Sequence, residues 1–249
     1  MNDIECWYAC HRGLRRKINQ DNVYISGKVK TVLCPRIEEI HNENVEDAGA
    51  SVFAVFDGMG GEEAGEMASY LCADYMSQCD FNSEREDLLE KFCYDANRIV
   101  VEYADDNGIF SMGTTAAIIR VDNNVIEACN LGDSRIFRIN DNNIELLSVD
   151  HTIGLDKAKK TPLYQYIGIP ENETLLQPHI VKKKYYKNDF YLICSDGLSD
   201  YVSDIKIKDI VEECTESKKG GRGIADKLLQ EALASGGKDN ISLILIKLN

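Results

Sequence analysis

Short apolar runs recur along the chain and are separated by longer stretches in which apolar residues return with a different period. The runs are rich in β-branched and aromatic residues, which is typical of β-strands. They are NVYI from Asn22, SVFAVF from Ser51, TTAAIIRV from Thr114, NVIEACNL from Asn124, RIFRI from Arg135, FYLICS from Phe190 and ISLILI from Ile241. Because several of these runs follow one another directly, they predict antiparallel sheets.

Two helices are predicted between the runs that begin at Ser51 and Thr114. In residues 62–79, apolar side chains recur every three or four positions, which predicts a helix with one face toward the core. The next helix is predicted to begin after Ser83, which forms a capping box with Glu86, and to end near Gly108.

Two more helices are predicted late in the chain, over residues 205–214 and 224–233. Gly236 and Gly237 follow the second one, at the place where a helix would stop. Helices before and after a block of strands predict an α+β fold in which the helices pack outside the sheets.

The remaining long stretches have no clear period. Residues 27–49 mix charged residues with asparagine, residues 156–177 are rich in lysine and turn residues, and both are predicted to be loops or insertions. We find no repeat, low-complexity tract or proline-rich linker, so one domain over residues 1–249 is the simpler prediction.

The charge balance of the 249 residues narrows the class of partner. Lysine and arginine number 28 against 42 acidic residues, for a net charge of -14, which argues against binding to nucleic acid or to an anionic membrane. No apolar run approaches the roughly 20 residues of a membrane span, and the first residues lack the features of a signal peptide. We therefore expect a cytoplasmic protein.

The nine cysteines lack a Cys-x-x-Cys pair, and the four histidines are far apart. A structural zinc site requires such ligands at short spacing, so the sequence disfavours zinc. The cysteines are expected to be reduced residues of the core.

Acidic residues stand repeatedly at the ends of the predicted strands. Asp57 and Asp196 each follow an apolar run and precede glycine, while Asp21 and Asp239 stand just before runs. Antiparallel neighbours place the end of one strand beside the start of another, so all four carboxylates can meet at one rim. For any single copy, an Asp-Gly turn without further function is the better interpretation.

Such a cluster needs neutralisation, because two carboxylates about 5 Å apart repel by roughly 3 kcal/mol at an effective dielectric constant near 20. Protonation would neutralise it through raised pKa values. Hard divalent cations such as Mg²⁺ or Mn²⁺ also choose an all-oxygen ligand set, and we favour them over protonation.

A basic segment precedes Asp21 in this otherwise acidic chain: Arg12, Arg15, Arg16 and Lys17. The fork of an arginine suits a two-point grip on phosphate. Arg16 is close enough in sequence to Asp21 to point into the same rim, whereas for the other three a solvated loop is the simpler interpretation.

Taken in order, a series of motifs closely resembles the bacterial branch of the metal-dependent protein phosphatase 2C (PPM) family. The motifs are Arg16 with Asn19-Gln20-Asp21, FAVFDGMGG from Phe53, Gly113-Thr114-Thr115, Gly132-Asp133-Ser134-Arg135, Asp150-His151-Thr152, SDGLSD from Ser195 and Lys238-Asp239-Asn240. Each motif is weak alone, but their order along nearly the whole chain makes coincidence very improbable.

The resemblance implies a central sandwich of two antiparallel β-sheets with a pair of α-helices on each outer face. It also implies hydrolysis of phosphoserine and phosphothreonine in proteins, with two Mn²⁺ or Mg²⁺ ions in the core site and a weaker third ion. The partners would be phosphorylated protein substrates and an opposing serine/threonine kinase, with no nucleic acid and no membrane, and the chain is expected to be a monomer.

By position, Asp57 resembles the carboxylate that bridges the two ions, and the carbonyl of Gly58 resembles a further ligand. Asp196 and Asp239 resemble ligands of the first ion, and Asp21 resembles a carboxylate on the side of the second. Asp133 and Asp196 resemble the pair that holds the third ion. Arg16 aligns with the arginine that grips the substrate phosphate.

The chain departs from the family pattern at several positions. Met59 replaces the histidine of eukaryotic members, a proposed general acid, and Gln20 replaces a glutamate found in many of them. The segment between His151 and Leu163 is shorter than the flap usual in bacterial relatives. Gly60 and Gly61 are expected to form a tight turn, and Glu62 and Glu63 to lie at a helix N-terminus.

Other classes of protein were weighed against this one. Cys10 and Arg16 have the spacing of a cysteine-dependent phosphatase loop, but that loop also needs a preceding histidine, and Ala9 stands there. Gly58, Gly60 and Gly61 do not complete a dinucleotide-binding motif. A catalytically inactive phosphatase-like binding module remains the alternative from another class, and it would be expected to lack metal ligands.

Overall fold

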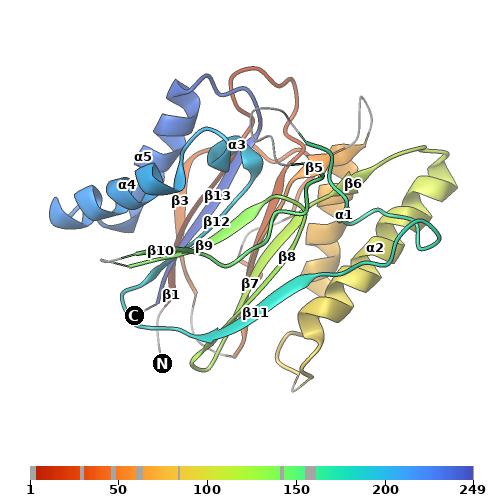
Figure 1. The fold of residues 1–249 in the computed structure, drawn as a ribbon, viewed down its shortest axis with the longest axis horizontal. Coiled ribbons are helices and arrows are strands. Elements are labelled where there is room, and N and C mark those ends of the chain that lie inside the picture. Colours follow the sequence, from red (N-terminus) through yellow and green to blue (C-terminus); the bar gives the residue numbers. More distant parts are fainter. Residues whose placement is uncertain are drawn as a thin grey trace.

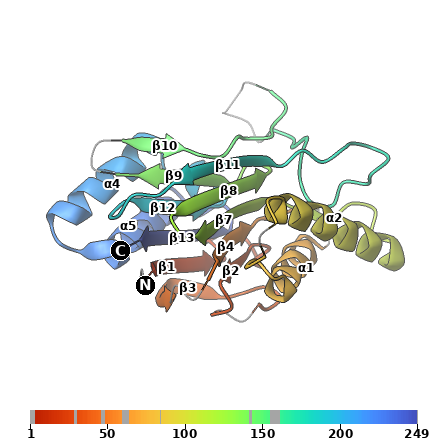
Figure 2. The same ribbon diagram turned by 90° about the horizontal axis from the view of Figure 1, so that it is seen from below.

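The computed structural model describes residues 4–28, 31–45, 49–59, 64–83, 85–140, 143–154 and 161–248. Two antiparallel sheets lie face to face, and helices cover the outer face of each (Figures 1 and 2). This arrangement is the α+β sandwich that the motifs implied. Within the described ranges, no helix is long and apolar enough to cross a membrane.

The larger sheet has six strands and the smaller has five. The six-stranded order is β10 (Ile144–Leu146), β9 (Arg135–Ile139), β12 (Phe190–Cys194), β13 (Ile241–Leu248), β1 (Ile4–His11) and β3 (Ile37–Val45). The five-stranded order is β11 (His179–Lys184), β8 (Val125–Leu131), β7 (Ala116–Asp122), β4 (Ser51–Phe56) and β2 (Asn22–Ile25). A small ladder joins β5 (Gly58–Met59) to β6 (Gly113–Thr114).

Alternation along each strand divides the core into layers. In β4, Phe53 and Val55 face the other sheet, whereas Val52, Ala54 and Phe56 face the helices. Strands in the middle of both sheets are therefore apolar on both faces, which explains why their sequences are continuous apolar runs.

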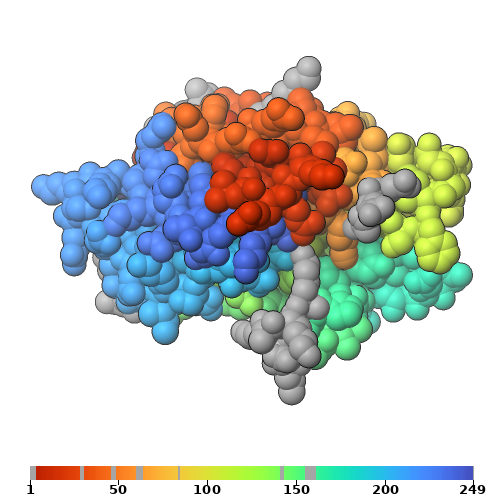
Figure 3. Space-filling model, turned by 90° about the horizontal axis from the view of Figure 1, so that it is seen from above, coloured from red at the N-terminus to blue at the C-terminus, as the bar shows by residue number. Residues whose placement is uncertain are grey.

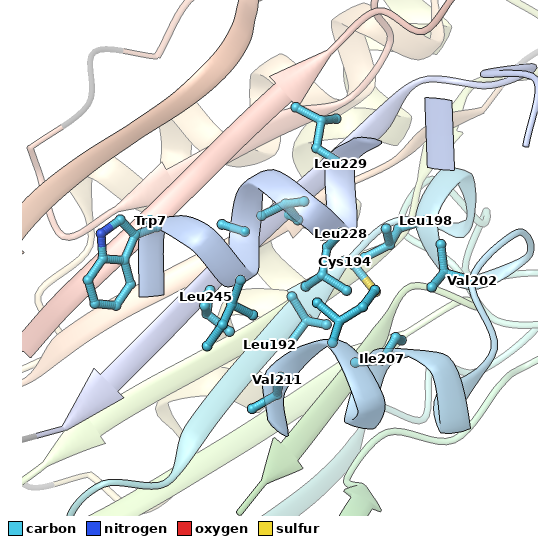
Figure 4. Close-up of a cluster of buried hydrophobic side chains, with 14 of the residues drawn as sticks. Trp7, Leu192, Cys194, Leu198, Val202, Ile207, Val211, Leu228, Leu229 and Leu245 are labelled. Carbon is cyan, nitrogen blue, oxygen red and sulfur yellow. The ribbon is translucent and has the colours of Figure 1, made fainter. Parts of the chain in front are cut away.

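Each outer layer contains a pair of helices. α1 (Gly65–Gln78) and α2 (Leu88–Asn107) pack on the five-stranded sheet. α4 (Asp204–Glu216) and α5 (Gly220–Ala234) pack on the six-stranded sheet, and the one-turn helix α3 (Asp196–Ser199) follows β12. Figure 4 shows the apolar layer between this second helix pair and its sheet, including Trp7 on β1 and Leu228 on α5.

All seven predicted strands and all four predicted helices are present, with shifted bounds. The prediction of a loop over residues 27–49 was wrong, because β3 occupies Ile37–Val45. It pairs only with β1 at the edge of its sheet, so most of its side chains are exposed and its sequence is polar. Strands β1, β10 and β11 were not predicted.

Two further predictions concern helix starts and the second loop. The capping box at Ser83 was wrong, because the backbone there forms turns and α2 begins only after Asp87. In the second predicted loop, residues 161–177 contain only isolated β-bridges, while residues 156–160 lie outside the described residues. The predictions for Gly60, Gly61, Glu62 and Glu63 also fall outside them.

Gly221 on α5 allows this helix to approach Trp7. A Cβ atom at position 221 would lie 2.1 Å from the Trp7 ring. Gly221→Ala is therefore expected to lower the free energy of unfolding by about 1–3 kcal/mol, although alanine is normally the better helix former. Urea denaturation followed by the fluorescence of Trp7, the chain's single tryptophan, measures the change.

The matched control is the same substitution in a Trp7→Leu background, followed by circular dichroism. The smaller side chain is expected to relieve most of the cost of Gly221→Ala. Equal stability of Gly221→Ala and the wild type would contradict this packing.

Candidate active site

Strand register brings acidic residues from both sheets to one end of the sandwich, the upper end in Figure 1. Asn22 on β2 pairs with Phe56 on β4, so Asp21 and Asp57 come next in register. Asp57 also continues the face of β4 that Phe53 and Val55 turn toward the other sheet.

The six-stranded sheet delivers its acids to the same end. The ladder between β12 and β13 continues beyond both strands, because the Ser195 N–H donates to the Ser242 carbonyl over 3.0 Å. Gly197 then packs against this loop so closely that a Cβ would lie 1.8 Å from the Asn240 carbonyl oxygen. Asp196 and Asp239 are therefore held on adjoining segments.

Asp57 is the centre of this charge. Burial raises the pKa of Asp57 well above its usual range, and repulsion from Asp21, Asp196, Asp133 and Asp239 raises it further. The four other aspartates that the resemblance implies as metal ligands are thus electrostatic neighbours of Asp57.

Two threonines hold the backbone of Asp57. The Thr115 hydroxyl accepts a hydrogen bond from the Asp57 N–H over 3.1 Å. The Asp57 carbonyl accepts from the Thr115 N–H and from the Thr114 hydroxyl, both over 2.9 Å. Thr115 also shares a 2.7 Å hydrogen bond with the Ser134 hydroxyl, which connects Asp57 to the turn that carries Asp133.

Gly58 lies where no side chain fits. A Cβ at this position would lie 2.2 Å from the Gly65 carbonyl oxygen and 2.4 Å from the Gln20 carbonyl oxygen. The Gly58 N–H donates to the same Gln20 carbonyl over 3.2 Å. Glycine therefore lets the segment after Asp57 approach the start of α1 and the segment before Asp21.

Asp21 lies deeper, at the end of the layer between the sheets. It is 1% exposed, and one of its carboxylate oxygens accepts a 2.7 Å hydrogen bond from the Ser242 hydroxyl. Burial is the largest cause that raises the pKa of Asp21, to about 7, with repulsion from Asp196 and Asp239 adding to it and hydrogen bonds from Ser242 and Ser195 opposing it.

Arg16 stands at the outer edge of this cluster. Its guanidinium donates to the Asp239 carboxylate over 2.7 Å, and its side chain is 43% exposed. The charges of Asp239, Asp196 and Asp57 all raise the pKa of Arg16 against the opposing effect of its burial, so it stays a cation beside them.

A cavity of about 270 Å³ opens among these groups. Asp57, Asp133 and Asp196 form its acidic wall, and Met59 and Thr115 lie beside them. Residues 161–163 close the other side. The cavity therefore joins the strand-end acids to the segment that follows His151.

The aspartates of this cluster lie near one another, but their carboxylates do not converge on a single point. Within the described ranges, no three His, Cys, Asp or Glu side chains converge as tightly as the ligands of one ion. Repulsion between like charges and the pairing of Asp239 with Arg16 give a physical reason for this spacing.

Cys10 is close to the acids but is poorly suited to be a nucleophile. Its thiol is completely buried, and burial and the nearby Asp21 raise its pKa above the ordinary value, whereas a reactive cysteine needs a lowered one. Arg16, which the cysteine-phosphatase interpretation would place around phosphate with Cys10, points to Asp239 instead.

Asp150 and His151 have structural partners. Arg135 donates to both oxygens of Asp150, with a shortest distance of 2.6 Å. A ring nitrogen of His151 accepts from the Gly132 N–H over 3.1 Å, one residue before Asp133. Gln20 donates to Glu66 over 3.1 Å.

Sequence reasoning missed the neutral residues that hold the acids. The Asn240 amide donates to the carbonyls of Arg12 and Ile18, over 2.8 and 3.0 Å, and its oxygen accepts from the Gln20 N–H over 2.9 Å. The buried Asn19 amide donates to the Cys10 carbonyl over 2.9 Å. The available signal was a polar residue within or directly beside an apolar run, as at Asn240 and Ser242.

Comparison with known proteins identifies the family to which this chain belongs. The family model of protein phosphatase 2C matches residues 30–160 and 162–241. The chain belongs to the protein phosphatase 2C family. Among protein phosphatase 2C relatives, the serine/threonine protein phosphatase PstP of Mycobacterium tuberculosis is 30% identical over 253 residues, covering 94% of this chain and 43% of PstP. The chain thus spans less than half the length of that relative.

Solved structures of bacterial phosphatases share the protein phosphatase 2C fold of this chain. The serine/threonine phosphatase Stp1 from Staphylococcus aureus is 26% identical, with a TM-score of 0.79 and coverage of 98% of this chain and 94% of Stp1. The catalytic domain of PstP in complex with two manganese ions is 27% identical, with a TM-score of 0.74 and coverage of 99% of both chains.

The buried acids give the metal-free protein a distinctive dependence of stability on pH. Because the pKa of Asp21 rises from 3.8 to about 7 on folding, the folded state binds the extra proton between these values. The free energy of unfolding should therefore fall as pH rises through this window. At pH 8 in EDTA, Asp21→Asn is expected to be more stable than the wild type by about 1–3 kcal/mol, and at about pH 3.5, below both pKa values, the difference should nearly vanish.

Urea denaturation at both pH values measures this difference, and Asp106→Asn on the exposed face of α2 is the control. The prediction is that ionisation of Asp21 lowers the free energy of unfolding. A variant that is less stable than the wild type at pH 8, or equally stabilised at both pH values, would contradict it.

Proposed function

We propose that this chain is a metal-dependent protein serine/threonine phosphatase with a single catalytic domain over residues 1–249. The observation that carries the proposal is the set of aspartates from both sheets around one cavity, with Arg16 at its edge. Kinship with PstP and Stp1, both serine/threonine phosphatases, supports the same chemistry.

The residues present fit divalent metal ions. Every side chain of the cluster offers hard oxygen ligands, which Mn²⁺ and Mg²⁺ prefer. The raised pKa values of Asp57 and Asp21 mark negative charge that a cation would stabilise. Gly58 follows Asp57 directly and packs against the backbone of Gln20, next to Asp21, so its backbone lies near both acids.

The proposed ligands are those that the resemblance to the protein phosphatase 2C family implies. Asp57 would bridge two ions, the Gly58 carbonyl would be a further ligand, and Asp196 and Asp239 would hold the first ion. Asp21 would lie on the side of the second ion, and Asp133 with Asp196 would hold a weaker third. The manganese ions in the PstP catalytic domain support two of these ions. Bound divalent ions supply an activated water and neutralise phosphate charge.

The chain's own side chains would bind and orient the phosphate. Arg16 presents a guanidinium at the open edge of the cluster, and its fork matches two phosphate oxygens. Met59 lines the cavity but has no proton to donate, so the leaving alcohol takes its proton from another group. The backbone of half-buried Asp57 is held by Thr114 and Thr115, which limits its movement during the reaction.

The proposed partners are phosphorylated proteins and an opposing serine/threonine kinase, with the chain acting as a monomer in the cytoplasm. The acidic net charge of -14 supports neither nucleic acid nor an anionic membrane as a partner. An inactive binding module is the alternative, and the retention of every expected aspartate argues against it.

Release of phosphate from a phosphothreonine peptide tests the proposal. Activity is expected to require Mn²⁺ or Mg²⁺, to be lost in EDTA and to survive a thiol alkylator, because Cys10 is buried. Asp196→Asn is expected to lower kcat by at least about 1,000-fold, which corresponds to roughly 4 kcal/mol of barrier. Activity that resists EDTA and is abolished by alkylation would overturn the metal assignment and favour Cys10.

Arg16→Ala is expected to lower kcat/KM for the same peptide by about 10- to 100-fold, because one charged hydrogen-bond donor to phosphate is lost. Arg16→Lys should recover only part of this, since lysine lacks the fork. Arg98→Ala, on the exposed surface of α2, is the matched control. Unchanged kcat/KM in Arg16→Ala would exclude Arg16 as the phosphate-binding residue.

A further inference from the structure

A basic strip runs beside the candidate active site, and we define it as Arg12, Arg15, Arg16, Lys17 and Lys238. Residues 12–17 contain four cations and no acid in a chain with a net charge of -14. Figure 3 views the end of the sandwich where the acids meet, and the red surface of the segment that follows β1 occupies the middle of that face, beside blue surface from late in the chain.

Hydrogen bonds hold the strip in place. The Asn240 amide donates to the backbone at both ends of the loop, on the Arg12 and Ile18 carbonyls. The Leu14 N–H donates to the Gly237 carbonyl over 2.7 Å, which places the loop against the segment that carries Lys238. A backbone fixed in this way loses little conformational entropy when it binds a partner.

Arg16 pairs with Asp239, but three other cations of the strip are exposed. Arg15 and Lys17 are exposed, and neither forms an ion pair with any residue that the structure describes. Lys238 is also exposed and lies 5.8 Å from the centre of the Tyr201 ring. These cations are therefore available to a partner.

The position of the basic strip beside Arg16 indicates which kind of molecule it binds. Arg16, the residue proposed to bind phosphate, lies between Arg15 and Lys17 in the chain. A phosphorylated residue at Arg16 therefore brings the neighbouring residues of the same peptide close to the other cations, since an extended chain advances about 3.3 Å per residue. Because the chain as a whole carries a net charge of -14, an acidic substrate gains attraction only from local clusters of cations, and this strip is the one next to Arg16.

We propose that the basic strip binds acidic side chains that flank the phosphorylated residue, which makes acidic segments of phosphoproteins the preferred substrates. This inference rests on the proposed phosphatase function and adds the class of substrate. Arg15 and Lys17 contact the flanking acids and take no part in the chemical step.

Two phosphothreonine peptides of equal length test the proposal, one with two aspartates on each side of the phosphothreonine and one with serines in those places. The strip variant is Arg15→Glu with Lys17→Glu. The matched control is Lys184→Glu with Lys187→Glu, which changes the net charge equally near the start of β12, at the opposite end of the sandwich. The ratio of kcat/KM for the acidic peptide to that for the serine peptide is measured for each protein.

The wild type and the control are expected to prefer the acidic peptide, mainly through KM, and higher salt should weaken the preference. The strip variant should lose about 5- to 30-fold of this preference, as expected for reversal of two exposed charges. Its turnover of p-nitrophenyl phosphate, which has no flanking residues, should equal that of the wild type. An unchanged preference, an equal loss in the control or a parallel loss on p-nitrophenyl phosphate would overturn the proposal.

Failure of the phosphatase function itself would be visible separately, as no turnover of any substrate with Mn²⁺ or Mg²⁺. Fluorescence anisotropy with a fluorescein-labelled acidic peptide would then still test the strip. Weaker binding by the strip variant than by the control would support the proposal, and equal binding by both would overturn it.

Discussion

Negative charge gathered at one end of the sandwich is the constraint on which the rest of this structure depends. Asp21 is buried and Asp57 half-buried there beside Asp196 and Asp239, and the charges of the neighbouring acids make ionisation of Asp57 and Asp21 harder. Separating them would require β2 to leave β4 or β12 to leave β13, because register places Asp21 beside Asp57 and holds the loops of Asp196 and Asp239 together. Three apolar layers keep that register, so packing of the whole sandwich opposes repulsion at its end.

The neutral polar residues around the aspartates fix the positions of these acids but do not neutralise their negative charge. Three neutral side chains form hydrogen bonds there. Thr115 accepts from the backbone of Asp57, Ser242 donates to the carboxylate of Asp21, and Asn240 donates to the carbonyl of Arg12. Arg16 is the cation paired with the cluster at its open edge. Negative charge therefore lines the cavity, while the positive charge of Arg16 is paired with Asp239 at the exposed edge of the cluster.

Sequence predicted the middle of the fold better than its edges. Strands such as β4 and β13 are apolar on both faces and stand out as continuous runs, whereas β3 and β11 pair on one side only and carry exposed polar side chains. The start of α2 was misplaced because a capping pattern occurs in a segment whose backbone forms turns. The sequence pattern of a short segment does not show which other segments it will contact, and those contacts decide whether it becomes an edge strand or the start of a helix.

The acidic residues of the site were recognisable from local sequence, whereas the residues that form hydrogen bonds with them were not. Asp57 and Asp196 were recognisable because they end apolar runs, and the resemblance to protein phosphatase 2C added Asp133. Asn240 and Ser242 were not assigned a role, because their partners Gln20 and Asp21 lie 220 and 221 residues away and only the assembled sheet reveals them.

The position of β13 also bears on how the protein is made. This strand lies between β12 and β1 in the middle of the six-stranded sheet, although it follows every other described strand in the chain. During synthesis, β1 therefore waits with one edge unpaired until residues 241–248 leave the ribosome, and contacts of such long range form slowly. The nascent chain cannot complete its acidic cluster before that moment, and until then the unpaired edge of β1 is exposed to aggregation.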